Sequence, residues 1–361
     1  MSNFLSLIFY LLFFSLSALL LYYGNKKKNN VIIGLSLTIP IIIGGFRLNV
    51  GTDYDSYIRM YQSFLNVPFV DYFNNISIEP GFYLLIKLSQ FISNDTYVLF
   101  LLSSTFTILA FYLGLKITDP KHKGIIFLLF LIIIYPITFN ATRQGISISI
   151  CFLALSHLIG GHPKKFFFWV IAAATFHVSS LVCIIAYFIR KLLISSRDSS
   201  QKNRFLFENI SFVIFCIVII PIIFPNLPNI SIISKYIEYG DYISGVSITT
   251  IMFKIIIVLI ITYFYKKISR KSPYASDYYT LGLLEISTIG LWISSAVLFR
   301  ISLLFTTFNL ILLSEIIDTF DKRFDKHVIQ AIIIIFALVY FYVAYYVAGQ
   351  AEIVPYNFVR F

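Results

Sequence analysis

Apolar runs long enough to cross a lipid bilayer recur along the whole chain, and short polar stretches separate them. A helix needs roughly 20 apolar residues to cross about 30 Å of hydrocarbon. The pattern predicts spans over residues 4–23, 31–46, 97–115, 124–139, 144–160, 209–224, 251–265 and 328–347, with more in 166–189 and 281–317. The predicted fold is an all-α polytopic membrane protein of about 10–11 transmembrane helices, forming a single domain over residues 1–361.

Two of these apolar runs do not fit a simple crossing. Residues 281–317 as one helix would be about 55 Å long, so the chain must turn near Ser294–Arg300. Residues 166–189 follow an inner loop, yet the most basic loop of the protein comes directly after them. We therefore expect a broken or hairpin helix with its tip near Thr175–Ser180. Such backbone is tolerated where protein or a water-filled cavity surrounds it.

Composition and charge agree with a membrane protein. Of the residues 58% are hydrophobic and 12% charged, whereas soluble domains are about half apolar and a quarter charged. The net charge of +11 does not indicate nucleic acid, because most Lys and Arg residues fall in short loops between spans. Such clusters mark the cytoplasmic side. This orientation makes segments of about 47–95 and 225–250 extracytoplasmic. The three cysteines lie in apolar runs, and no metal site is predicted.

Three arginines stand at the predicted outer ends of spans: Arg47, Arg143 and Arg300. An arginine at the helix centre costs at least ~2.5–3.5 kcal/mol on insertion scales, and less near the interface. Their retention at one depth suggests that they converge on an anion. Arginine suits phosphate because its fork donates two parallel hydrogen bonds and stays charged. The alternative is that each one reaches the outer headgroups by snorkelling.

Acidic residues and one histidine complete the unexplained polar set. In "FRLNVGTDYDSY" Asp53 and Asp55 flank Tyr54, so an extended backbone would point both carboxylates the same way. Asp53 is alternatively the N-cap of a helix that starts near Tyr54. Glu79 precedes Pro80, a pattern typical of a helix start. His177 lies inside 166–189, where it is either a proton acceptor or a structural hydrogen-bonding residue.

A family resemblance is carried by the ordered motifs "FR…GTDYDSY", "EPGF", "TRQGISISI", "FHVSS" and a late "FR". Between about Phe46 and Phe308 the chain resembles the EpsG-like branch of Wzy-type polysaccharide polymerases. The late "FRISLLF" lacks the tyrosine often found after that arginine. The positions that match the recurrent ones of the family are Arg47, Gly51, Asp53, Tyr57, Glu79, Arg143, Gln144, His177 and Arg300.

The resemblance implies a lipid-dependent glycosyltransferase with a GT-C-like architecture in the bacterial cytoplasmic membrane and an active site facing the periplasm. Undecaprenyl-diphosphate-linked oligosaccharide repeats would serve as both donor and acceptor. The growing glycan would pass from its lipid diphosphate to the terminal sugar hydroxyl of another repeat, with no cofactor. A Wzz-like chain-length regulator and a repeat-unit flippase are implied partners. O-antigen, capsule and exopolysaccharide remain open as products.

This chemistry assigns expected roles to matching residues and to tyrosines of the outer loops. Arginines stabilise the charge of the departing diphosphate, and the attacking hydroxyl needs a base. Tyrosine rings stack on sugars, although interfacial anchoring is an alternative role. Rival functions are a flippase or transporter of lipid-linked sugars, an O-antigen-ligase-like transferase, and an acyltransferase that uses His177. The expected roles are diphosphate binding for Arg47, Arg143 and Arg300; base for Asp53, His177 or Glu79; and glycan binding for Tyr54, Tyr57, Gln144 and Tyr239.

Overall fold

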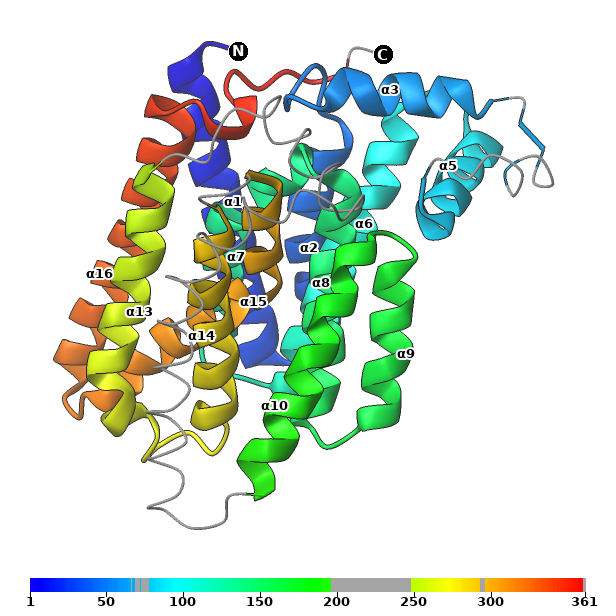
Figure 1. Ribbon diagram of the computed structural model, residues 1–361. Coiled ribbons are helices and arrows are strands. Elements are labelled where there is room, and N and C mark those ends of the chain that lie inside the picture. The colour runs from blue at the N-terminus through cyan, green and yellow to red at the C-terminus, as the bar shows by residue number, and fades with distance from the viewer. Residues whose placement is uncertain (66, 69–71, 73–77, 196–247, 293–295, 360–361) are drawn as a thin grey trace. The chain divides into compact units, whose positions relative to one another are not determined.

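In the part of the chain that the structure describes, the regular elements are all helices (Figure 1). The structure is a computed structural model, and it describes all residues except 66, 69–71, 73–77, 196–247, 293–295 and 360–361. Among the described residues there is no strand, and one isolated bridge pairs Arg47 with Phe358. The all-α prediction is confirmed. The predicted span 209–224 and nearly all of the outer segment 225–250 lie outside the described residues.

Apolar helices of membrane-spanning length confirm the polytopic class. Within the described residues five helices meet the length and hydropathy of a span: Asn3–Lys27, Tyr97–Thr118, Thr142–Ile159, Ile301–Thr319 and Arg323–Val347. Two shorter helices, Asn30–Gly45 and Lys123–Ile133, are also apolar. The GT-C-like arrangement remains a prediction.

The chain divides into two compact units. Unit 1 comprises Met1–Leu181 and Ile334–Phe361, and unit 2 comprises Val182–Ile333. Helix α16 (Arg323–Phe341) belongs partly to each. The single domain expected over residues 1–361 remains a prediction, and each unit is described by itself.

Helix α8 (Thr142–Ile159) forms the centre of unit 1. It packs against α6 (Tyr97–Thr118) and α9 (Pro163–Ala174), and buried residues extend around its whole circumference. Burial on all sides is typical of a core helix. Next to this core α2 (Asn30–Gly45) packs on α6. Helix α1 (Asn3–Lys27) packs on α2 and on α7 (Lys123–Ile133). The 3₁₀ turn η1 (Tyr135–Phe139) follows α7.

A proline inside α2 shows how the unit satisfies its backbone. Pro40 has no N–H, so the carbonyl of Ser36 loses its helical donor. The hydroxyl of Ser17 on α1 donates to that carbonyl at 2.7 Å, and the hydroxyl of Ser36 donates back to the Ser17 carbonyl at 2.8 Å. The exchange joins α1 to α2 where a membrane offers no water as a partner.

Two shorter helices follow α2 in the predicted outer segment. Helix α3 (Tyr54–Ser63) buries Tyr54, Tyr57 and Tyr61, which share one helical face. The helix start predicted at Pro80 is confirmed by α5 (Pro80–Ile92). The expectation that an extended backbone points Asp53 and Asp55 the same way is wrong, because the helix begins at Tyr54 and includes Asp55.

The break predicted within 166–189 is confirmed. Helix α9 ends at Ala174, a turn follows, and the chain continues as the 3₁₀ helix η2 (Val178–Cys183) and then α10 (Ile184–Ser195). The amide of His177 donates to the Ala173 carbonyl at 3.0 Å, and the amide of Ser180 donates to the His177 carbonyl at 3.1 Å. The turn therefore holds His177 by its backbone on both sides.

Unit 2 contains the long helices α13 (Ile248–Ile268), α14 (Ala275–Trp292) and α15 (Ala296–Glu315), followed by the 3₁₀ turn η4 (Ile316–Thr319). Each of the three long helices packs against the other two. The turn predicted near Ser294–Arg300 agrees with the separation of α14 from α15, although residues 293–295 are outside the described part.

The residues after α16 belong to unit 1, and the sequence did not predict their structure. A π-helical turn η5 (Tyr342–Val347) and a 3₁₀ turn η6 (Gln350–Glu352) lead into an irregular stretch. Figure 1 shows this red stretch at the same end of unit 1 as α3. We call residues 350–359 the return segment.

Candidate functional site

The candidate site is built around Glu79, the residue before α5. A residue that precedes proline favours extended backbone, and Glu79 has φ −68° and ψ 143°. It occupies the N-cap position of α5, yet its side chain makes no capping hydrogen bond. The carboxylate is directed to side chains from two other parts of unit 1.

The first partner of Glu79 is His177. The amide of Gly81 donates to the Thr175 carbonyl at 2.7 Å, which joins the start of α5 to the turn after α9. A side chain at Gly81 would prevent this approach, because a Cβ there would lie 2.8 Å from the same carbonyl oxygen. Next to this contact, Nδ1 of His177 lies 3.1 Å from Oε1 of Glu79.

The second partner is Arg143, in the first turn of α8. Its Nη1 lies 2.6 Å from Oε2 of Glu79, so the two carboxylate oxygens face different partners. The backbone amide of Arg143 donates to the Tyr57 hydroxyl at 3.5 Å. This contact gives a partner to one of the amides that every helix start leaves without an internal acceptor.

Glu79, Arg143 and His177 together are called the Glu79 cluster. The exposed fractions of their side chains are 18%, 29% and 22%, so each is partly buried and remains accessible. Burial by itself raises the pKa of Glu79, but the hydrogen bond from His177 and the charge of Arg143 outweigh it and lower the pKa from 4.5 to about 2. Glu79 is therefore an anion, and the ring nitrogen facing it must donate.

Arg47 is placed differently from Arg143. Its side chain is 1% exposed, with the guanidinium carbon 4.2 Å from the Phe100 ring centre and 4.7 Å from that of Phe139. Its terminal nitrogens donate to the Gly44 carbonyl at 2.8 Å, to the Phe139 carbonyl at 3.1 Å and to the Thr142 hydroxyl at 3.3 Å. In this conformation Arg47 supports the start of α8. A direct contact with diphosphate, which remains a prediction, requires the guanidinium to leave these partners.

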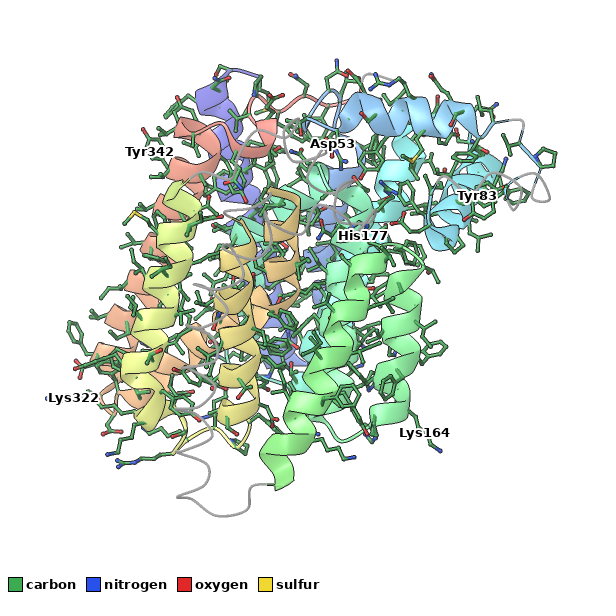
Figure 2. The ribbon with its side chains drawn as sticks, in the orientation of Figure 1. Asp53, Tyr83, Lys164, His177, Lys322 and Tyr342 are labelled. Atoms are coloured by element: carbon green, nitrogen blue, oxygen red, sulfur yellow. The ribbon has the colours of Figure 1, made fainter. Side chains whose placement is uncertain are left out.

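Asp53 lies outside the Glu79 cluster, in the loop before α3. It holds the N-cap position of that helix without a side-chain capping bond, and its side chain is half-buried. The Thr52 hydroxyl approaches its Oδ1 at 3.4 Å. Figure 2 shows Asp53 toward one end of unit 1, Lys164 toward the opposite end and His177 between them.

The residues predicted to bind glycan are buried where the structure describes them. Tyr54 stacks on Phe100 at a centroid distance of 4.9 Å, and Tyr57 packs edge-on against Phe82 at 5.7 Å. Gln144 is also buried. Their contacts with sugar remain predictions. Tyr239 and the side chain of Arg300 lie outside the described residues, so convergence of three arginines is likewise still a prediction.

Unit 2 contains a charged cluster whose acid the sequence analysis did not single out. Nζ of Lys254 on α13 lies 2.5 Å from Oε1 of Glu285 on α14, and Asn309 on α15 donates to Oε2 at 2.7 Å. The side chains of Lys254 and Glu285 are only 3% and 2% exposed. With Ser302 and Thr306, which also contact Lys254, they form what we call the Glu285 cluster. The sequence contained a signal for this cluster, because Glu285 lies within an apolar run and a carboxylate there needs a partner.

The fold and the site together define a class: an all-α multi-pass membrane protein with a glutamate, an arginine and a histidine gathered at the ends of its helices. The sequence model of the EpsG family matches residues 30–358, nearly the whole chain. The protein therefore belongs to the EpsG family, a family of Wzy-like polymerases. No curated protein and no solved structure matches the chain.

Family membership confirms the resemblance seen in the sequence motifs and establishes the general role. The protein is a multi-pass inner-membrane protein of the polysaccharide polymerase type, which is a glycosyltransferase-like activity. Its substrates are lipid-linked sugars in a membrane.

Proposed function

We propose that the protein transfers a growing glycan from undecaprenyl diphosphate to the terminal sugar hydroxyl of another lipid-linked repeat, at the outer face of the cytoplasmic membrane. The observation that carries the proposal is the single carboxylate of Glu79 held between Arg143 and His177 at 2.6 and 3.1 Å. This arrangement brings a cation and a base to one partly exposed place, as the departure of a diphosphate and the attack of a hydroxyl require.

Arg143 is the proposed diphosphate contact. Nη1 of Arg143 donates to Glu79, and the guanidinium has further N–H groups. The side chain of Arg143 is 29% exposed. A guanidinium binds phosphate oxygens through parallel hydrogen bonds, which an ammonium cannot reproduce. As the sugar–diphosphate bond breaks, negative charge grows on the leaving oxygen, and a cation already in place stabilises it.

His177 is the proposed proton acceptor. Because the ionised Glu79 holds Nδ1 as a donor, Nε2 is left as the nitrogen that accepts a proton. Glu79 itself is a weak base, since its pKa is about 2, and its role is to orient the imidazole and to stabilise the cation that forms. Asp53 is the alternative base.

The reaction balances with these groups alone. The acceptor oxygen forms a bond to the anomeric carbon of the donor while the bond from that carbon to the diphosphate oxygen breaks. The hydroxyl proton goes to Nε2 of His177, and the electron pair of the broken bond leaves with the diphosphate beside Arg143. In this proposal further residues extend the substrate site. Diphosphate is also bound by Arg47 and Arg300, and glycan is bound by Tyr54, Tyr57, Tyr239 and Gln144. A flippase supplies repeats and a Wzz-like protein regulates chain length.

The test compares Arg143→Lys and His177→Gln with the wild type, both as surface glycan length in cells and as product ladders from purified protein and lipid-linked repeats. We expect single repeats in place of long chains. Arg59→Lys is the matched control, because Arg59 is exposed on α3 and contacts Ser56. Long chains of normal length with both variants would refute the proposed site. Complete loss of extracytoplasmic repeats would indicate a flippase.

A further inference from the structure

The return segment forms backbone hydrogen bonds with the loop that precedes α3. The Leu48 amide donates to the Asn357 carbonyl at 2.9 Å, and the Val359 amide donates to the Phe46 carbonyl at 2.9 Å. The Gly51 amide donates to the Glu352 carbonyl at 3.1 Å. These bonds join stretches about 300 residues apart in the chain. They hold the loop of residues 46–53 from one side.

Tyr356 anchors the return segment to the interior of unit 1. Its side chain is fully buried, and its hydroxyl donates to the Ile43 carbonyl at the end of α2 at 2.9 Å. Its amide donates to the Ser6 hydroxyl at 2.9 Å, and its ring stacks on Phe9 with centroids 4.9 Å apart. Tyr356 therefore connects α1, the end of α2 and the return segment.

The other side of the same loop contacts the residues that lead into α8 and the first residue of that helix. The Thr52 amide donates to Oδ1 of Asn140 at 3.0 Å. Gly51 has φ +101°, and a Cβ there would lie 2.7 Å from the same Oδ1, so glycine is required for this approach. Arg47 reaches the Phe139 carbonyl and the Thr142 hydroxyl from the same loop. Arg143 is the next residue after Thr142.

We propose that the return segment is a positioning element of the active site, with Tyr356 as its key residue. It holds the loop of residues 46–53, and that loop holds the first turn of α8, which carries Arg143 toward Glu79. This proposal rests on the proposed function insofar as Arg143 binds diphosphate. A displacement of about 1 Å at a binding group weakens catalysis strongly even when the change lies far from the chemistry.

The test uses Tyr356→Phe, which removes one hydroxyl and keeps the ring. Tyr342→Phe is the matched control, because Tyr342 is exposed on η5 and its ring stacks on that of Tyr346. Binding of farnesyl diphosphate to the purified full-length protein in detergent is measured by calorimetry. Loss of one hydrogen bond predicts about fivefold weaker binding for Tyr356→Phe and no change for Tyr342→Phe.

A double-mutant cycle with Arg143→Lys tests whether Tyr356 acts through Arg143. We expect Tyr356→Phe to weaken binding much less in the Arg143→Lys background, because interacting residues are not additive. An equal loss in both backgrounds would overturn the positioning role. The same holds if Tyr356→Phe leaves binding unchanged in the wild-type background.

Hydrogen exchange separates this inference from the proposed function. Tyr356→Phe should accelerate amide exchange at Leu48 and Gly51 and also in residues 140–145, whereas Tyr342→Phe should not. Faster exchange at Leu48 and Gly51 with unchanged exchange in 140–145 would overturn the positioning role. If Arg143→Lys binds the probe as tightly as the wild type, the diphosphate role of Arg143 fails, and the exchange result still decides the mechanical coupling.

Discussion

Two carboxylates of this protein, Glu79 and Glu285, have similar partners and opposite environments. Each binds a cationic side chain through one oxygen and a nitrogen donor through the other. In the Glu79 cluster the side chains are 18–29% exposed, whereas Lys254 and Glu285 are 3% and 2% exposed. The chemistry of the groups is nearly the same, and their access to solvent differs about tenfold.

The difference in solvent exposure separates a cluster suited to joining helices from one that a ligand is able to reach. Oε1 of Glu285 accepts from both Lys254 and Thr306, and Asn309 donates to the other oxygen and to the Gly282 carbonyl. A buried charge with this many partners joins three helices and leaves little freedom to exchange a partner for substrate. The side chains of Arg143 and His177 remain 29% and 22% exposed, so a ligand is able to reach them. A cluster of charged residues does not by itself indicate a binding site. Solvent access and hydrogen-bonding capacity left for a ligand are also needed.

The largest expected effect is on stability, in unit 2. Lys254→Met leaves Glu285 as a buried charge without its cation, which costs about 3–5 kcal/mol. Thermal unfolding of the purified protein in detergent measures it. The double variant Lys254→Met, Glu285→Gln should recover most of the loss, because it removes both charges and keeps an acceptor for Asn309. A single variant as stable as the wild type would contradict a buried ion pair.

The next effect is on activity, in unit 1. Glu79→Gln removes the anion that holds His177 and Arg143, and we expect the polymerisation rate to fall about 100-fold. The free energy of unfolding should change by about 1–3 kcal/mol, less than for Lys254→Met, since the cluster is partly exposed. Asp55→Asn, the same change at an exposed position of α3, should alter neither quantity. The comparison breaks down if Glu79→Gln destabilises the protein as much as Lys254→Met does.

A smaller loss is expected from Gly81→Ala. The new Cβ would lie 2.8 Å from the Thr175 carbonyl oxygen, so the start of α5 must move away from the turn that holds His177. Overpacking typically costs about 1–3 kcal/mol, and we expect at least a tenfold lower polymerisation rate. Gly34→Ala on α2 is the control, because no atom lies within 4 Å of its added Cβ. Equal rates for the two variants would show that this close approach does not position the site.

The smallest effect is the pH dependence of stability. The pKa of Glu79 is lowered from 4.5 to about 2, so its stabilising contribution is fully present above pH 4.5 and is lost as the pH falls toward 2. The difference in Tm between the wild type and Glu79→Gln should therefore not shrink from about pH 8 to about pH 5 and should shrink below that range. A difference that already shrinks between pH 7 and pH 5 would mean that Glu79 is not held ionised by its two partners.

Much of the fold was predictable because its signals are local. The runs that became α1, α2, α6 and α8 show their length and apolar character directly, and Pro80 marks the start of α5. The break after Ala174 followed from the side on which the next basic loop must lie. Of the two alternatives for Asp53, the extended backbone was wrong and the N-cap position of a helix starting at Tyr54 was right, because polar loop residues next to tyrosine fit a strand or a short helix equally well.

The candidate residues were predictable as a set, and their partnership was not. Sequence alone determined that this chain crosses a membrane, belongs with the EpsG-like polymerases and retains unusual polar residues at the ends of its helices. Only the tertiary structure decided that Glu79 meets Arg143 and His177, 64 and 98 positions away, and that Arg47 is enclosed by phenylalanine rings and carbonyls. The physical reason is that hydropathy and turn preferences act over neighbouring residues, whereas hydrogen bonds between distant segments depend on how the helices pack.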